Sequence, residues 1–217
     1  MIFVDEFGAN LGMTRLYGYA PSGQRTYGKA PQNADPNLTL VLGLGLQGVV
    51  APVVFEGAMN RPRFETYAQE YLAPVLRPDD IVLVDRLKPH LYPEVRAAIE
   101  ATGADYHPLP PYSPDFSPVE ECGSKIKQTL RTAGQRTVVG VLDAMDRALH
   151  QVTPKDAEGW FRHAGYLDRP PRPRPQRSGT PRSRASRART PRNRRARDPP
   201  TPSPRGAVCT RPNRESL

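Results

Sequence analysis

The sequence predicts an α/β domain with a mixed sheet and flanking helices, followed by a basic tail. Two short apolar runs, residues 2–4 and 81–84, each precede an aspartate and are typical of buried strands. Between and after them lie segments whose apolar residues recur with the spacing of amphipathic helices. Strands that alternate with helices favour a sheet covered by helices on its faces.

A change of composition at residue 168 divides the 217-residue chain into two parts. Residues 168–217 hold 15 Arg, 11 Pro and 3 acidic residues, which give a net charge of +12. Because the whole chain carries +9, residues 1–167 carry −3, and this excludes a uniformly basic DNA-binding domain. The tail has no aromatic residue and little else to bury, so we expect residues 168–217 to be disordered and residues 1–167 to fold.

The cysteine pattern and the first residues favour a cytoplasmic protein. Cys122 and Cys209 form neither a CxxC nor a Cys/His spacing, so we expect no structural disulfide or zinc site. The chain starts without the basic and long apolar regions of a signal peptide, and no apolar run is long enough for a membrane span. We therefore expect no membrane partner.

The first third of the chain is predicted to supply strands. Residues 2–4 form a strand that ends on Asp5. Residues 15–25 are rich in turn formers and predict a loop or an irregular hairpin. Residues 38–46 and 49–55 are apolar and partly β-branched with a two-residue gap, which indicates a β-hairpin.

Helices and strands alternate in the middle of the chain. Asn60 can cap a helix, and four residues at positions i, i+3, i+7 and i+8 are expected to be its buried face: Phe64, Tyr67, Tyr71 and Leu72. Residues 81–84 form a second buried strand, which ends on Asp85. Residues 93–100 predict a helix, with Val95, Ala98 and Ile99 inward, and residues 106–109 a short strand.

Two closing helices follow a proline-rich loop at residues 110–118. The first is expected to bury Val119, Cys122, Ile126 and Leu130. The second is expected to bury Val138, Leu142, Met145 and Leu149.

Three carboxylates are candidates for a metal site. Parallel strands joined by a helical crossover place their carboxyl ends on one edge of a sheet, so Asp5 and Asp85 can converge. Glu120, at the start of the helix after the proline-rich loop, is the candidate third acid. Divalent cations such as Mg²⁺ prefer oxygen ligands, and one or two ions held in this way assist phosphodiester displacement. Glu6 points to the opposite strand face and Glu121 is turned about 100° from Glu120, so neither neighbour is a substitute.

Each candidate also has a structural interpretation. A single aspartate after a strand is commonly a solvated turn residue. Ser117 and Glu120 have the spacing of a capping box, with Pro118 as the first helical residue, and this spacing alone favours a capping role for Glu120. The four histidines have no metal-ligand spacing, and we expect core or surface roles for His90, His107, His150 and His163.

Lys125, Lys127 and Arg131 give a basic side to the same helix as Glu120. A set of this kind is either a solvated face or a surface that meets a phosphate backbone.

Four motifs carry a family resemblance. They are Asp5-Glu6 after the first strand, Arg-x-Tyr-Gly-x-Ala-Pro-x-Gly-x-Arg over residues 15–25, Asp85-Arg86-Leu87-Lys88-Pro89-His90, and Pro110-Pro111-Tyr112-Ser113-Pro114-Asp115-Phe116-Ser117-Pro118-Val119-Glu120. With these motifs the chain resembles, from residue 2 to residue 167, the catalytic half of mariner-type DDE transposases of the bacterial insertion-sequence branch. The 34 residues at positions 86–119, between the second and third acids, also match the spacing of that family.

The resemblance implies an RNase H-like fold, two bound Mg²⁺ or Mn²⁺ ions, and cleavage and strand transfer of DNA at transposon ends. Asp5, Asp85 and Glu120 match the catalytic, metal-binding triad. The resemblance further implies a homodimer on DNA and a bacterial, nucleoid-associated location. We expect five basic residues to contact DNA: Arg15, Arg25, Lys125, Lys127 and Arg131.

Three residues depart from the family pattern. Arg86 stands where the family has Asn, and it either points away from the acids or weakens metal binding. Gly123 stands where an aromatic residue is usual, which should leave a hole in the helix face and cost about 1 kcal/mol of helix propensity. Ser117 replaces Asn and keeps the cap.

The family recognises transposon ends through a helix-turn-helix segment before the catalytic domain, and Asp5 lies only five residues from the start. We therefore expect either a separate helix-turn-helix protein as a partner or a truncated, inactive copy. The tail is either an electrostatic arm for DNA or, as we favour, out-of-frame translation of GC-rich sequence. In both cases it should bind nucleic acid nonspecifically, and a nucleic-acid-binding protein that acts through this tail is the alternative function.

Overall fold

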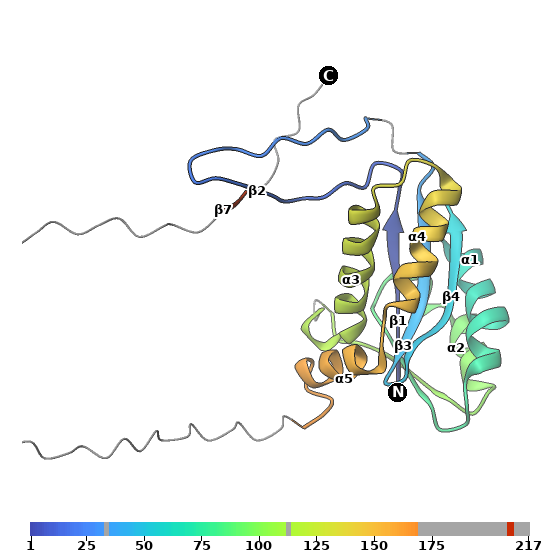
Figure 1. Ribbon diagram of the computed structural model, residues 1–217. Helices are drawn as coiled ribbons and strands as arrows, with labels where there is room; N and C mark the ends of the chain where they lie inside the picture. Colours follow the sequence, from blue (N-terminus) through green and yellow to red (C-terminus); the bar gives the residue numbers. More distant parts are fainter. Residues whose placement is uncertain (33–34, 112–113, 169–207, 211–217) are drawn as a thin grey trace, which may run out of the picture.

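A five-stranded mixed sheet forms the centre of the protein. We describe a computed structural model, which places residues 1–32, 35–111, 114–168 and 208–210 (Figure 1). The strand order is β4-β3-β1-β5-β6. The strands are β1 (Ile2–Ala9), β3 (Leu38–Gly45), β4 (Gly48–Glu56), β5 (Ile81–Val84) and β6 (Asp105–Pro108). β3 is antiparallel to both of its neighbours, whereas β5 is parallel to β1 and β6, so the predicted hairpin and the mixed sheet are confirmed.

Helices cover both faces of this sheet (Figure 1). Helices α3 (Pro118–Ala133), α4 (Val138–His150) and α5 (Pro154–His163) pack on one face with Phe3 and Phe7. Helix α1 (Arg61–Thr66), its continuation η1 (Tyr67–Leu72) and helix α2 (Pro93–Glu100) pack on the other face with Ile2 and Val4. Successive residues of β1 therefore point alternately to the two cores, as the pleat requires. This three-layer arrangement has the RNase H-like fold that the resemblance implied.

The helix after Asn60 begins as predicted but changes its geometry after one and a half turns. The Asn60 side chain accepts a hydrogen bond from the Arg63 N–H at 3.1 Å and so caps α1. From Tyr67 the chain continues as the π-helical turn η1, in which each turn is wider than in an α-helix. The wider turn moves Tyr71 off the buried face, so that it is 43% exposed, whereas Ala68 and Leu72 are buried. The prediction that Tyr71 points inward is wrong.

The last helices differ from the prediction in two ways. In α4 the side chains of Val141, Ala144, Met145 and Ala148 are buried, whereas Leu142, which was expected to face the core, is 38% exposed. Small alanine side chains occupy the inner face because α4 packs closely against α3. Helix α5 was not predicted, although Thr153 and Asp156 form a capping box at its start.

The chain between β1 and β3 projects from the body of the domain (Figure 1). It is irregular apart from the short strand β2 (Gly18–Ala20), which agrees with the predicted loop or irregular hairpin. β2 pairs in antiparallel fashion with β7 (Val208–Thr210), the one part of the tail beyond Asp168 that is described. The other tail residues, which were expected to be disordered, lie outside the described residues.

The remaining short elements are η2 (Ala73–Val75), η3 (Lys88–Leu91) and η4 (Pro114–Phe116). No helix in the described part of the chain has the length and the apolar character that crossing a membrane requires.

Candidate active site

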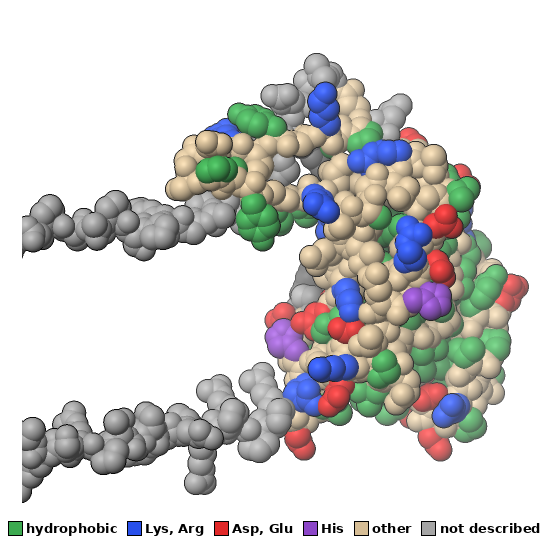
Figure 2. Space-filling view, in the orientation of Figure 1, with side chains coloured by type: hydrophobic (Ala, Val, Ile, Leu, Met, Phe, Trp, Pro, Cys, Tyr) green, Lys and Arg blue, Asp and Glu red, His purple; other side chains and the backbone are tan. Residues whose placement is uncertain are grey.

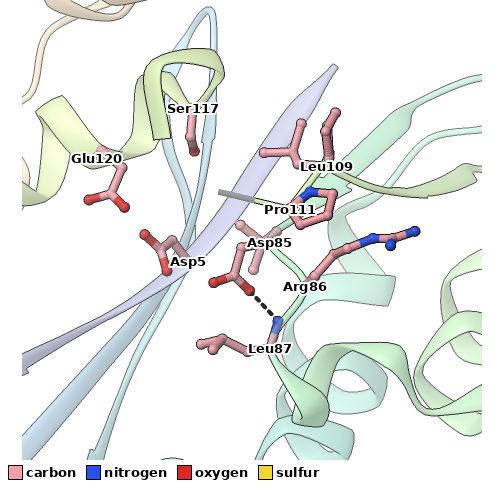
Figure 3. Close-up of a pocket in the computed structure, with 10 residues that line it drawn as sticks. Asp5, Asp85, Arg86, Leu87, Leu109, Pro111, Ser117 and Glu120 are labelled. Carbon is pink, nitrogen blue, oxygen red and sulfur yellow. Dashed lines mark hydrogen bonds between the residues drawn. The ribbon is translucent and has the colours of Figure 1, made fainter. Parts of the chain in front are cut away.

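A pocket opens where β1 and β5 lie side by side. Val4 pairs with Val84 in the parallel register, so Asp5 and Asp85 are the next residues on two adjacent strands. The pocket has a volume of about 420 Å³ and is lined by Val4, Asp5, Asp85, Arg86, Leu87, Leu109, Pro110, Pro111, Ser117 and Glu120. Figure 3 shows the carboxylates of Asp5, Asp85 and Glu120 turned toward this shared space. Three acids from distant parts of the sequence thus line one pocket.

Asp5 reaches this pocket from inside a strand, not from a strand end as the sequence suggested. β1 runs on to Ala9 because β3 pairs with it along residues 3–9. On its other side β1 loses its partner after Val4, since β5 ends at Val84. Asp5 therefore lies where one edge of β1 becomes open.

Burial and neighbouring acids disfavour the ionised form of Asp5. The Asp5 side chain is half-buried, and its Oδ1 accepts a hydrogen bond from the Glu6 N–H at 2.8 Å. Burial raises the pKa of Asp5 to about 7; the Glu6 N–H opposes this rise, and the charges of Glu120, Glu6 and Asp85 add to it. The pocket therefore carries an excess of negative charge that a bound cation would relieve.

Asp85 is held by its own loop and by a buried imidazole. Its Oδ1 accepts a hydrogen bond from the Leu87 N–H at 3.0 Å and lies 2.5 Å from His90 Nδ1. The other ring nitrogen, Nε2, lies 2.9 Å from Glu6 Oε2. Burial alone would raise the pKa of Asp85, but His90 and the Leu87 N–H outweigh it and hold the pKa below its ordinary value. Burial likewise lowers the pKa of His90, but the contacts with Asp85 and Glu6 outweigh it and raise the pKa to about 9.

Sequence reasoning expected only a core or surface role for His90 and missed these contacts. The side chain is indeed fully buried. Its spacing from Asp85, which places it in the short helix η3 after the Asp85 loop, was the signal that could have located it.

Glu120 is not used as a helix cap, so the structural interpretation of this residue is wrong. Ser117 is the N-cap of α3, but its side chain makes no capping hydrogen bond, and the helix lacks the predicted capping box. The Glu120 backbone N–H bonds to the Ser117 carbonyl at 3.1 Å, and the Glu120 residue is exposed at the pocket. Its carboxylate is therefore available to a ligand.

The donor set of this pocket fits a hard divalent cation, although the three carboxylates are too far apart to coordinate one ion together. Carboxylate oxygens are the ligands that Mg²⁺ and Mn²⁺ prefer. Within the described ranges, no three His, Cys, Asp or Glu side chains form a ready-made metal-binding group. Binding an ion would therefore require the side chains of Asp5, Asp85 and Glu120 to close on it.

The family described as DDE superfamily endonuclease matches residues 1–138. The chain belongs to this family. No curated protein matches the sequence.

Several solved structures of mariner transposase Mos1 share the fold of this DDE-family chain. The Mos1 strand transfer complex has a TM-score of 0.58 at 21% identity over 75% of this chain and 50% of that chain. The Mos1 paired-end complex with the left transposon end has a TM-score of 0.56 at 19% identity, over 76% and 54%. The Mos1 paired-end complex with Mn has a TM-score of 0.56 at 18% identity, over 77% and 56%. The chain spans about half the length of these transposase chains.

Two departures from the DDE family pattern have local explanations. Figure 3 shows the Arg86 side chain extending away from Asp5 and Glu120, which is the first of the two alternatives for this residue. Gly123 leaves no hole in α3: a Cβ built there would lie 2.1 Å from Cε1 of Phe7, so the Phe7 ring fills this space. The prediction of a hole was wrong because it ignored the close approach of α3 to β1.

The five basic residues expected to contact DNA do not form one surface. Lys125 faces α5, where its Nζ lies 2.7 Å from Asp156 Oδ2, so it does not share a basic side with Lys127 and Arg131. The reason is helix geometry, because positions 125 and 127 are turned about 200° apart whereas 127 and 131 are one turn apart. The Lys127 ammonium lies 5.3 Å from the centre of the Phe7 ring.

Arg15 and Arg25 lie elsewhere, exposed on the projecting segment between β1 and β3. Figure 2 shows separate basic side chains spread over this segment and the body.

Proposed function

We propose that this chain is the catalytic domain of a DNA transposase, in which Asp5, Asp85 and Glu120 bind divalent metal ions for cleavage and strand transfer at transposon ends. In this proposal residues 1–167 are the catalytic domain and residues 168–217 are a basic extension. The observation that carries it is the convergence of these three carboxylates on one pocket in a DDE-family fold.

Each acid has a distinct part in holding the ions. Asp5 lies between the other two, and its pKa near 7 means that it is the acid that must lose a proton before it can bind a cation at neutral pH. Asp85 is already ionised at neutral pH and is held by His90 and the Leu87 N–H. Glu120 sits in the first turn of α3 and is exposed, so it can adjust to the ion. Bound Mg²⁺ or Mn²⁺ supplies activation of the attacking oxygen and stabilisation of the leaving oxygen.

The proposed substrate is the DNA of transposon ends and of the target. This proposal draws on the similarity to Mos1 complexes, two of which are paired-end complexes, one of them with the left transposon end. The motif over residues 110–120 further supports a place in the bacterial insertion-sequence branch and, by analogy, a homodimer on DNA. Because the chain spans about half of the Mos1 chains, recognition of the ends falls to a segment or a partner outside the catalytic domain.

A nicking assay on supercoiled plasmid with Mn²⁺ tests the proposal. The full chain should convert the plasmid to open circles, and Asp5→Asn, Asp85→Asn and Glu120→Gln should each reduce nicking to the level of plasmid without protein, because each removes a proposed metal ligand. Glu121→Gln is the matched control: Glu121 is adjacent in sequence, but its Oε1 pairs with His163 Nδ1 at 2.6 Å. Nicking that survives Asp85→Asn, or that is lost equally in the control, contradicts the proposal.

A further inference from the structure

His90 occupies an unusual place for a buried histidine. Its side chain has no exposed surface, and it stacks on Phe64 with the ring centres 4.1 Å apart. Its backbone is fixed as well, since the Tyr106 hydroxyl donates to the His90 carbonyl at 2.5 Å and the His90 N–H donates to the Leu87 carbonyl at 3.0 Å. The imidazole therefore has little freedom to move.

Both ring nitrogens of this fixed imidazole meet carboxylates that come from different strands. Nδ1 lies 2.5 Å from Asp85 Oδ1, directly after β5, and Nε2 lies 2.9 Å from Glu6 Oε2 on β1. Glu6 follows Asp5 in the sequence and points to the opposite face of β1, toward the core that contains Phe64. The three side chains form a row, Glu6–His90–Asp85, that ends at the pocket.

This row leaves one oxygen of Asp85 for the pocket. Oδ1 accepts the hydrogen bond from the Leu87 N–H and is also the oxygen that lies 2.5 Å from His90 Nδ1. Oδ2 has no hydrogen-bond or ion-pair partner among the residues that the structure describes, and Figure 3 shows the carboxylate directed toward Asp5. A group that contacts the far side of a metal-binding side chain fixes the orientation of that side chain and commonly raises the affinity of the site for the metal ion.

We propose that His90 is a positioning residue that fixes Asp85 with Oδ2 toward the metal ions, and that Glu6 in turn holds His90. The inference rests on the proposed function, because it concerns how one of the proposed metal ligands is oriented. His90 does not act on DNA itself, since it has no exposed surface and both ring nitrogens face carboxylates of the protein. Simple filling of the core does not explain the arrangement either, because an apolar side chain would fill the space without facing two carboxylates.

Mn²⁺ affinity of the full chain, measured from the electron paramagnetic resonance signal of free Mn²⁺, tests this inference without an activity assay. His90→Asn should raise the Kd about 10-fold to 100-fold, the usual effect of losing a group that orients a ligand. Glu6→Ala should raise it less, and Glu6→Gln, which keeps an acceptor for His90 Nε2, should restore most of the affinity. The two Glu6 variants keep the test decisive if His90→Asn does not fold.

Thr39→Val is the matched control for a purely structural role. It removes the buried hydroxyl that donates to the Gly57 carbonyl at 2.7 Å, so it should lower the Tm, but Thr39 does not line the pocket and the variant should leave the Mn²⁺ Kd unchanged. If the parent binds Mn²⁺ and folded His90→Asn or Glu6→Ala binds it equally well, the inference is wrong and the proposed function stands. If the parent does not bind Mn²⁺, the proposed function fails and the inference falls with it.

Discussion

Replacing Asp5 by asparagine should make the metal-free protein more stable. The folded chain releases the Asp5 proton near pH 7, whereas the unfolded chain releases it near the ordinary value of 3.8. Between these values the folded state binds more protons than the unfolded state, so the stability of the parent falls as the pH rises from about 4 to about 7. Asparagine cannot ionise, and the variant should not show this loss.

The shift of the Asp5 pKa by about three units corresponds to at most about 4 kcal/mol, since each unit is about 1.4 kcal/mol. Because Asp5 is only half-buried, solvent and side-chain movement reduce this, and we expect about 2 kcal/mol above pH 7. In a domain of this size that raises the Tm by about 4–8 °C. The gain should shrink steadily below pH 7 and vanish near pH 4.

Thermal unfolding of the full chain with a chelator, at pH 4, 5.5 and 8, measures this difference. Asp85→Asn is the matched control, and its effect on stability should have the opposite sign. The contacts with His90 and the Leu87 N–H that lower the pKa of Asp85 stabilise its carboxylate, and asparagine has no such charge. This control should be less stable than the parent at pH 8. An Asp5→Asn variant that is less stable than the parent at pH 8, or whose gain in stability does not change with pH, would show that Asp5 does not ionise at a cost to the folded state.

Three further predictions concern packing, capping and the tail. Gly123→Ala should lower the free energy of unfolding, measured in urea, by about 1–3 kcal/mol, because the added Cβ would collide with Phe7. The higher helix propensity of alanine offsets only part of this loss, and unchanged or increased stability would contradict the packing of Phe7 on Gly123. Asp156→Ala should cost about 1 kcal/mol at pH 7, by loss of the Thr153 capping box and the Lys125 pair. Since the pKa of Asp156 is lowered to about 2, the cost of Asp156→Ala should disappear as the pH falls toward 2. A cost that persists near pH 2 would contradict the role of the Asp156 carboxylate. The last change replaces four tail arginines by glutamine: Arg192, Arg194, Arg195 and Arg197. The slope of log K against log salt for duplex DNA should fall by at most about 3.6, and Mn²⁺ binding should not change. A slope equal to that of the parent would contradict this prediction.

The sequence predicted the sheet and the members of the pocket better than it predicted their geometry. Apolar runs located β5 and the β3–β4 hairpin, because runs that are this short and rich in β-branched residues favour a strand over a buried helix. The end of β1 was misplaced, since the polar Asp5 and Glu6 look like a strand terminus until β3 is known to pair beyond them. Strand pairing is a long-range property that a local pattern does not contain.

Errors in the helices have the same origin. The π-helical turn η1 moves Tyr71 off the buried face, and nothing in residues 67–72 signals this turn. Gly123 looked like a defect because the Phe7 ring that fills its place lies on another element. Ser117 and Glu120 have the spacing of a capping box, yet the side chains do not form one, and the true box lies at Thr153. Spacing alone therefore misassigned the carboxylate that lines the pocket.

Calorimetric titration of the full chain with Mn²⁺, in parallel with its Asp85→Asn variant, tests whether Asp5, Asp85 and Glu120 form a metal site. We expect saturable binding by the parent and no binding by a variant shown by circular dichroism to be folded. We also expect that binding strengthens as the pH rises through about 7, where Asp5 becomes ionised. A folded parent that binds no Mn²⁺, or an Asp85→Asn variant that binds it with the parent's affinity, would contradict the claim that these carboxylates form a metal site.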